Sequence, residues 1–453
     1  MRNIDRQKLG VAVAEEKAWF AATHPRSLAL FERAKGHLHD GVPMNWMVRW
    51  AGGFPVFVQE ARGSHFWDVD GNHYLDLCLG DTGAMTGHAP EATVAAIIRQ
   101  VQQGITFMLP IEDAVWVGEE LTRRFGLAYW QFALTATDAN RFAIRLARQI
   151  TGRDKILVFN WCYHGSVDES FATLHPDGRV GPRHGNIGPA VDPAQTTRVV
   201  EFNDIPALEA ALAHGDVACV LAEPAMTNIG IIHPEPGFHK TLRDLTRQAG
   251  TLLIIDETHT ICTGPGGYTQ AHGLQPDMLT IGKPIAGGVP AATYGFSAEV
   301  SDRIRQHTIL EEADVGGIGG TLAANALSIA AIRATLEQVL TPAAYQQMLP
   351  LADRFTVGVE GVIAELELPW IVKQLGCRAE YWFRPEPPRN GAEAAAAIDF
   401  ELDYYMHLAA LNRGILLTPF HNMALICPAT TAADIDRHTV VFRESVLNVL
   451  EEV

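Results

Sequence analysis

The stretch TLLIIDETHTICTGPGGYTQAHGLQPDMLTIGK, residues 251–283, decides the fold of this chain. It contains two short apolar runs, 252–255 and 278–282, and a charged residue follows each of them: Asp256 after the first and Lys283 after the second. Buried parallel strands deliver side chains to a site at their carboxyl ends. We therefore predict two such strands, with an acid and a lysine facing one pocket.

An acid paired with a lysine suits a particular kind of cofactor. A ring nitrogen that must stay protonated uses the acid, and an aldehyde on the same ring captures the amine of the lysine. Pyridoxal phosphate carries both groups. The pair of Asp256 and Lys283 therefore predicts a pyridoxal phosphate site.

Length and composition limit the possible classes of protein. With 453 residues, the chain suits one large domain and a smaller one, and its formal charge of −17 argues against nucleic acid or anionic membranes as partners. The six cysteines include no C-x-x-C pair, so we expect reduced thiols and no metal. The amino terminus lacks the apolar run of a signal peptide, and no apolar run approaches the ~20 residues that span a bilayer. We expect a cytoplasmic protein.

The order of periodic segments predicts the fold class. Residues 1–37 predict amphipathic helix broken at His24-Pro25, and residues 56–77 alternate like a small antiparallel sheet. Apolar strands are expected at 156–159, 199–202, 217–222 and 252–255, with helices at 90–103 and 138–150. Strands alternating with helices predict a doubly wound α/β fold with a mostly parallel sheet flanked by helices.

The same order predicts the domains. We expect a large cofactor-binding domain at residues 84–330 and a discontinuous small α+β domain made of residues 1–83 and 331–453. The cleft between two such domains is the default place for a site.

Two motifs along the large domain suit a cofactor with a phosphate and a ring. The segment TATDAN places Thr135, Ala136 and Thr137 at a helix amino terminus, which favours a phosphate, although Thr and Asp are also ordinary helix caps. The segment YHG follows the strand at 156–159. Its Tyr163 or His164 can stack on a planar ring and Gly165 permits close backbone approach, although a buried aromatic at a domain edge is an equal alternative.

Two further signals are weaker taken singly. Glu223 ends the strand at 217–222, where a buried carboxylate needs a partner that is either a cofactor or a structural hydrogen bond. The turn GGIGGTLAANAL is expected to place Thr321 at the start of the next helix, a geometry that suits a phosphate as well as a tight loop.

Taken together, the motifs resemble one family. The sequence is similar to the class III, fold-type I pyridoxal phosphate aminotransferases, near the glutamate-1-semialdehyde aminomutases, β-phenylalanine aminotransferases and D-phenylglycine aminotransferases. The resemblance covers nearly the whole chain, because the following motifs occur in family order: FWDVDGNHYLDL, GHAPEATVAAI, TATDAN, YHG, AEP, IIDETHT, GLQPDMLTIGKPIAGG and GGTLAANAL. Many motifs in one order are far more specific than any one of them.

The resemblance implies roles for individual residues. Lys283 matches the lysine that binds the cofactor covalently, and Asp256 matches the acid bonded to the pyridine nitrogen. Thr321 matches a threonine that reaches the phosphate held by the partner subunit, which implies a homodimer with shared active sites. The cofactor-binding residues implied in all are Thr135, Ala136, Thr137, Tyr163, His164, Gly165, Glu223, Asp256, Thr258, His259, Lys283 and Thr321.

Three departures from the family pattern bear on the cofactor. The usual S-G-T-E turn has Ala136 in place of glycine, and alanine tolerates positive φ poorly. Thr258 replaces an apolar residue under the ring. His259 stands where many relatives have Gln or Met, and either tunes the phenolic oxygen of the cofactor or is a structural histidine.

Residues for substrate recognition are harder to assign. Arg49 lies in a segment where some relatives keep an arginine that binds a carboxylate bidentately, although its flanking spacing differs. Trp46, Trp50 and Phe420 suit a bulky aromatic amine, and packing in the core or a dimer interface is an equal alternative.

The expected activity is that of an aminotransferase. It moves an amino group from an amine or amino acid, with aromatic β-amino acids or arylalkyl amines as expected donors, to a keto acid by a ping-pong mechanism. An aminomutase of the glutamate-1-semialdehyde type or an amino-acid epimerase would keep Lys283 and Asp256 and stays the alternative. A nicotinamide site needs G-x-G-x-x-G directly after a strand, and neither GPGG at 264–267 nor GGIGG fits. A sensor that binds the cofactor without turnover is a third possibility.

Overall fold

The computed structural model describes residues 2–307, 309–313, 315–419 and 421–451. The chain forms two compact units: unit 1 comprises Met1–Pro90, Ala343–Pro387 and Ala397–Val453, and unit 2 comprises Glu91–Pro342 and Pro388–Ala396. The boundaries expected at residues 83 and 330 lie earlier in the chain than these. The segment around Thr82 stays with unit 1, where its hydroxyl contacts the buried Arg378, and the helix that spans residue 330 packs within unit 2.

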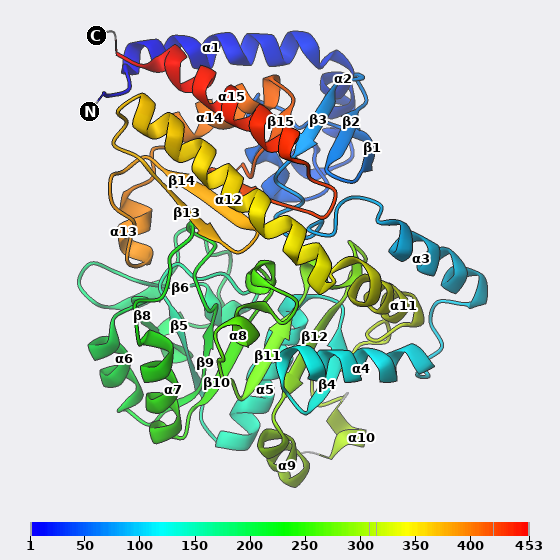
Figure 1. The fold of residues 1–453 in the computed structure, drawn as a ribbon. Coiled ribbons are helices and arrows are strands. Elements are labelled where there is room, and N and C mark those ends of the chain that lie inside the picture. The colour runs from blue at the N-terminus through cyan, green and yellow to red at the C-terminus, as the bar shows by residue number, and fades with distance from the viewer. Residues whose placement is uncertain (1, 308, 314, 420, 452–453) are drawn as a thin grey trace. The chain divides into compact units, whose positions relative to one another are not determined.

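Unit 2 is built on one seven-stranded sheet (Figure 1). Its strands, in spatial order, are β4 (Tyr129–Ala133), β12 (Ala292–Phe296), β11 (Met278–Ile281), β10 (Leu252–Asp256), β9 (Val217–Ala222), β5 (Lys155–Phe159) and β8 (Thr197–Val200). β12 runs antiparallel to both of its neighbours, and the other neighbouring pairs are parallel. The central strands β9, β10 and β11 are buried along their whole length, as their continuous apolar runs predict.

Helix α5 (Ala136–Thr151) provides much of the packing against this sheet. It contacts β9, β11 and β12, and its buried face includes Phe142, Leu146 and Ile150, spaced four residues apart. Thr135 caps its first turn, and Gly152 ends it in the left-handed conformation. The buried face and the cap together therefore fix the position of the amino terminus of α5 relative to the sheet.

The remaining elements of unit 2 surround the sheet. α6 and α7 pack side by side, next to β8 and β10 respectively, and α11 packs against α3 and α4. Their bounds are α3 (Glu91–Gln103), α4 (Glu112–Phe125), β6 (Ala172–Leu174), β7 (Val180–Pro182), α6 (Ile205–Leu212), α7 (Phe238–Ala249), α8 (Gly267–Ala271), α9 (Ala298–His307), α10 (Leu310–Ala313), α11 (Ala326–Ala334) and α13 (Gly391–Ala396).

Unit 1 combines helices with two small sheets. The sheets have the orders β1-β2-β3-β15 and β13-β14-β16. The bounds of its elements are α1 (Arg6–Thr23), α2 (Pro25–Ala34), β1 (Val58–Arg62), β2 (His65–Asp68), β3 (His73–Asp76), α12 (Pro342–Glu365), β13 (Ile371–Leu375), β14 (Arg378–Trp382), α14 (Phe400–Asn412), β15 (Ile415–Leu416), β16 (Met423–Leu425) and α15 (Ala432–Val449).

The predicted helix break at His24-Pro25 has a clear local cause. His24 separates α1 from α2, and Pro25 occupies the first turn of α2, where its missing N–H is not needed. The buried ring of His24 bonds the carbonyl of Phe20 at 2.8 Å and the hydroxyl of Tyr74 at 2.5 Å, which ties the break to β3. The helices in the described part of the chain include none with the length and apolar composition of a membrane-spanning segment.

Candidate active site

Asp256 is the last residue of β10 and lies buried at the carboxyl end of the sheet. Its carboxylate accepts hydrogen bonds from Asn140 Nδ2 at 2.9 Å and from the backbone N–H of Thr258 at 3.0 Å. A third partner is His164 Nδ1, at 3.0 Å. Three donors from different segments therefore hold one buried carboxylate in place.

These contacts decide the charge of the acid. Burial favours the neutral carboxyl, but the His164 hydrogen bond and charge, together with Thr258 and Asn140, outweigh it and lower the pKa of Asp256 to about 2. Burial likewise favours the neutral imidazole of His164, but Cys162 and Asp256 outweigh it and raise its pKa to about 10. The two side chains form an ion pair, and Asp256 is ionised at neutral pH.

Sequence reasoning missed two residues of this network. Asn140 donates to the His164 carbonyl at 3.1 Å as well as to Asp256, and Thr280 donates to Asn140 Oδ1 at 2.6 Å. Both are completely buried. The available signal was a polar Asn140 on the apolar face of α5, since a buried amide needs partners in the core.

Lys283 follows β11, the strand next to β10. The register pairs Asp256 with Thr280, so the lysine leaves its strand beside the acid, as the opening motif predicts. Lys283 adopts a left-handed backbone with φ of 47°, which is strained for a residue with a side chain and is typical of functional sites. Its Nζ lies 2.7 Å from Nε2 of His259.

The amino terminus of α5 lies against two glycine-dependent backbones. A Cβ on Gly165, whose φ is +76°, would lie 2.1 Å from Thr137 Oγ1, and a Cβ on Gly282 would lie 2.9 Å from the Cβ of Ala136. The Thr137 hydroxyl accepts the N–H of Ser166 at 3.0 Å, and Thr135 Oγ1 accepts that of Asp138 at 3.2 Å. Backbone N–H groups at this helix end favour an anion.

The other predicted residues of unit 2 differ in exposure. Tyr163 is 40 % exposed and makes an edge contact with Phe171 at 6.3 Å between ring centroids. Glu223 is buried directly after β9 and accepts a hydrogen bond from Thr227. Thr258 is buried too, and its hydroxyl has no hydrogen-bond partner among the described residues.

The prediction that Thr321 opens a helix is wrong. Residues 321–324 form a turn, and α11 begins at Ala326. Asn325 is its N-cap and accepts the N–H of Ser328 at 2.9 Å, which satisfies the first turn and sets the start of the helix. Thr321 itself is exposed and lines a cavity of about 630 Å³ in unit 2.

The residues predicted to recognise substrate belong to unit 1. Arg49 and Trp46 lie in a short 3₁₀ helix, Asn45–Arg49, and both are exposed. Trp50 is half-buried, with its ring 5.6 Å from that of His407. Phe420 lies outside the described residues.

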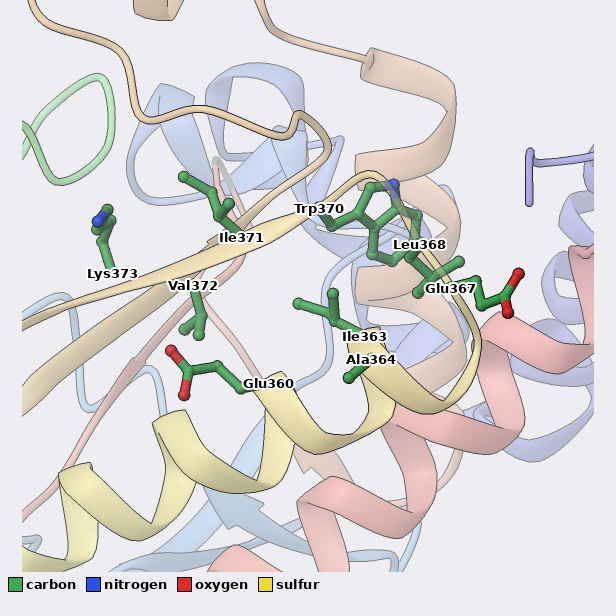
Figure 2. Close-up of a pocket in the computed structure, with 9 residues that line it drawn as sticks. All are labelled: Glu360, Ile363, Ala364, Glu367, Leu368, Trp370, Ile371, Val372 and Lys373. Carbon is green, nitrogen blue, oxygen red and sulfur yellow. The ribbon is translucent and has the colours of Figure 1, made fainter. Parts of the chain in front are cut away.

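A groove of about 540 Å³ in unit 1 is not lined by the paired acid and lysine that the opening motif predicts (Figure 2). It lies between the end of α12 and β13, with Trp370, Leu368 and Ile363 gathered at one end and Lys373 at the other. The acid and lysine of the opening motif lie in unit 2 instead.

The residues of unit 2 fit pyridoxal phosphate. Asp256 is an ionised acid suited to a protonated ring nitrogen, and Lys283 is an amine suited to the aldehyde. The helix end bounded by Gly165 and Gly282 suits the phosphate, and the unsatisfied hydroxyl of Thr258 suits a further polar group of a ligand.

Comparisons with known proteins give the family. The model of "Aminotransferase class-III" matches residues 46–441. A glutamate-1-semialdehyde 2,1-aminomutase of Sorangium cellulosum is 34 % identical over 93 % of this chain and 96 % of its own.

Solved structures agree. A glutamate-1-semialdehyde aminomutase from Pseudomonas aeruginosa has a TM-score of 0.96 and 50 % identity, over 98 % of this chain and 99 % of that one. A lysine-to-alanine variant of that protein was solved in complex with PMP. A β-phenylalanine aminotransferase from Variovorax paradoxus has a TM-score of 0.86 and 25 % identity, over 96 % and 97 % of the two chains. The chain therefore belongs to the class III aminotransferases, a fold-type I family of enzymes that use pyridoxal phosphate.

Proposed function

We propose that the protein exchanges an amino group with a carbonyl group, with Asp256 and Lys283 as its catalytic residues. The observation that carries this proposal is their position at the carboxyl ends of the neighbouring strands β10 and β11, with Asp256 held ionised. Pyridoxal phosphate, when bound, supplies an aldehyde that takes up the substrate amine and a ring that accepts the electrons left when a proton leaves the substrate carbon.

The chain's own residues then have separate tasks. Asp256 bonds the ring nitrogen and keeps it protonated, because a buried carboxylate favours a cation beside it. Lys283 moves a proton to and from the reacting carbon as a general acid and base. The amino end of α5, where Gly165 lies against Thr137, would hold the phosphate, and the half-exposed Tyr163 would stack on the ring.

The first candidate reaction is that of an aminomutase, which retains the amino group and moves it within one molecule. The support is the similarity to proteins named glutamate-1-semialdehyde aminomutases, at 34 % and 50 % identity over nearly the whole chain. The substrate is then an amino aldehyde of that type. This reaction is favoured over the transamination that the aromatic residues suggested.

Transamination is the second candidate. Its support is the likeness to the β-phenylalanine aminotransferase of Variovorax paradoxus and the exposed Trp46 in the short helix that ends at Arg49. An aromatic amino donor would use such a ring for stacking, and an arginine matches a carboxylate bidentately. The acceptor is then a keto acid.

One experiment separates these reactions. The purified enzyme with pyridoxal phosphate is incubated with glutamate-1-semialdehyde alone, and separately with a panel of aromatic β-amino acids, arylalkyl amines and small ω-amino acids plus pyruvate. An aminomutase forms the isomer with the amino and carbonyl groups exchanged and needs no added keto acid. A transaminase forms alanine.

The Lys283→Ala variant is the control, and it should retain the fold and lack whichever of the two activities the wild type has. Formation of neither product by the wild type, with the cofactor bound, contradicts both candidate reactions and leaves the binding-only alternative. Activity on small aliphatic ω-amino acids only would contradict the aromatic donor.

We also propose a homodimer. Its support is a group of exposed apolar side chains around the cavity that Thr321 lines, which suits a surface covered by a second copy. Those side chains include Phe107, Met108, Leu109 and Leu322.

A further inference from the structure

An arginine that follows the hairpin β6–β7 lies against the segment that carries Tyr163. Arg183 comes directly after β7, and its Nη2 donates a hydrogen bond to the carbonyl of Cys162 at 2.6 Å. The carbonyl of Cys162 and the N–H of Tyr163 belong to the same peptide group, which is planar and stiff. The bond therefore restrains the backbone at the point where Tyr163 begins.

The guanidinium of Arg183 also contacts two aromatic rings. Its Cζ lies 5.9 Å from the centroid of the Trp161 ring and 6.0 Å from that of the Phe171 ring. The Nε of Arg183 is buried and has no hydrogen-bond partner among the described residues. Desolvation strengthens the attraction between a cation and an aromatic ring. The rings therefore hold the arginine in place together with the carbonyl.

One of these rings leads directly to Tyr163. Phe171 contacts the ring of Tyr163 edge-on, with 6.3 Å between the centroids and 72° between the ring planes. Tyr163 is 40 % exposed, so the core does not enclose its ring. Arg183 thus reaches Tyr163 by two routes, which are the peptide group that precedes it and the ring that touches its edge.

The hairpin gives the arginine a fixed support. β6 and β7 pair in antiparallel register, and the N–H of Arg183 donates to the carbonyl of Phe171 at 2.9 Å. Asn160, directly after β5, accepts the N–H of Leu174 on β6 through its Oδ1 at 3.1 Å. The hairpin is thereby tied to the end of β5, the strand from which the segment 160–165 departs (Figure 1).

We propose that Arg183 is a positioning residue that orders Tyr163 for stacking on the ring of the cofactor. Ordering a partly exposed side chain costs conformational entropy when a ligand binds, and contacts that order it beforehand raise the affinity. Arg183 supplies such contacts without belonging to the segment that it orders. The inference rests on the proposed stacking role of Tyr163 and deepens it.

The chemistry of arginine suits this task. Its guanidinium is planar, so its edge donates to a carbonyl while its face lies against a ring. The ammonium of a lysine is a point charge on a flexible stem, and the side chain of a methionine has neither a charge nor an N–H group. Arg183→Lys should therefore keep part of the ordering, and Arg183→Met should lose it.

The test is a double-mutant cycle in cofactor affinity. The dissociation constant of pyridoxal phosphate is measured by absorbance titration of four apoenzymes: the wild type, Tyr163→Ala, Arg183→Met and the double variant. An aromatic contact corresponds to about three- to tenfold in affinity, so each single variant should bind more weakly by a factor in that range. The double variant should bind no more weakly than Tyr163→Ala, because the ring that Arg183 orders is then missing.

Two further variants separate ordering from a general loss of structure. Arg179 lies between β6 and β7, is exposed and bonds Asp177 at 2.7 Å, so Arg179→Met should leave the affinity unchanged. Arg183→Lys should recover part of the affinity that Arg183→Met loses. The visible circular dichroism of the bound cofactor reports on the surroundings of its ring, and Arg183→Met should change it in the same direction as Tyr163→Ala.

The cycle has outcomes that overturn the inference. Affinity losses that add in full in the double variant would mean that Arg183 and Tyr163 act independently. Unchanged affinity in Arg183→Met would show that the arginine does not order the ring. Unchanged affinity in Tyr163→Ala would contradict the stacking role of Tyr163 and the inference with it.

The proposed role of Lys283 is tested separately. Borohydride reduction of the holoenzyme should attach the cofactor to Lys283 in the wild type and in every variant of the cycle. Labelling of another residue contradicts the assignment of Lys283. Labelling of Lys283 together with affinity losses that add in full contradicts the inference about Arg183 alone.

Discussion

Asp256 and His164 make the stability of the protein depend on pH in a predictable way. The pKa of His164 is raised to about 10, so its contribution is complete below its ordinary value and is lost as pH rises towards 10. The pKa of Asp256 is lowered to about 2, so its contribution is complete above its ordinary value and is lost as pH falls towards 2. Both contributions are complete between about pH 4 and pH 6.5.

The variant His164→Gln should flatten the alkaline side of this profile. The free energy of unfolding of the wild-type apoenzyme should fall between about pH 7 and pH 10, because a charged pair loses its cation, and each pKa unit corresponds to about 1.4 kcal/mol. Urea unfolding at several pH values measures this slope. The control is His272, an exposed histidine whose ring stacks on Tyr268 at 3.8 Å, and His272→Gln should keep the wild-type slope. A slope in His164→Gln equal to that of the wild type would contradict the ion pair.

At the scale of elements, the meeting of α5 with the loop after β5 should control cofactor affinity. In Gly165→Ala, the added Cβ would lie 2.1 Å from Thr137 Oγ1, so the loop or the first turn of α5 must move. We expect a loss of at least about tenfold in pyridoxal phosphate affinity, equal to about 1.4 kcal/mol, measured by absorbance titration of the apoenzyme.

The other end of α5 provides the control for this change. Gly152 also has a left-handed backbone, with φ of +65°, but a Cβ there meets no atom within 4 Å. Gly152→Ala should therefore lower stability without changing affinity. Equal affinity losses in the two variants would mean that the effect comes from general destabilisation.

The elements also show what the sequence can and cannot predict. The strand at 217–222 agrees with β9 residue for residue, because a continuous apolar run stands between Asp216 and Glu223. β8 begins and ends earlier than predicted, since Phe202 belongs to an aromatic cluster beyond the strand, 5.1 Å from Phe159. Because an apolar residue can lie either within a strand or just after it, the sequence alone does not locate the end of β8.

The candidate site likewise has contacts that the sequence predicts and contacts that it does not. Strand ends placed Asp256 and Lys283 together in the sequence prediction, because parallel neighbours share an edge. The contact between Asn140 and Asp256 spans 116 residues, and the contact between Lys283 and His259 is made by a lysine whose backbone is left-handed. A polar residue on an apolar helix face indicates that a buried partner exists, but spacing and residue type do not say which residue that partner is, because this depends on the folded geometry.

At the scale of the whole molecule, the apolar surface near Thr321 should decide the oligomeric state. Met108 is 81 % exposed and Leu109 is 72 % exposed. Two neighbouring apolar side chains left in water favour a surface that a second copy covers. The double variant Met108→Asp/Leu109→Asp should dissociate the proposed homodimer, because it would place carboxylates in a buried apolar contact. Light scattering after size-exclusion chromatography should show that the molecular mass falls from about twice 49.4 kDa to 49.4 kDa.

The control is Val440→Asp, at a site in unit 1 that is 54 % exposed, and it should leave the molecular mass unchanged. A wild-type protein of 49.4 kDa at micromolar concentration would contradict the dimer and, with it, the sharing of Thr321 between subunits.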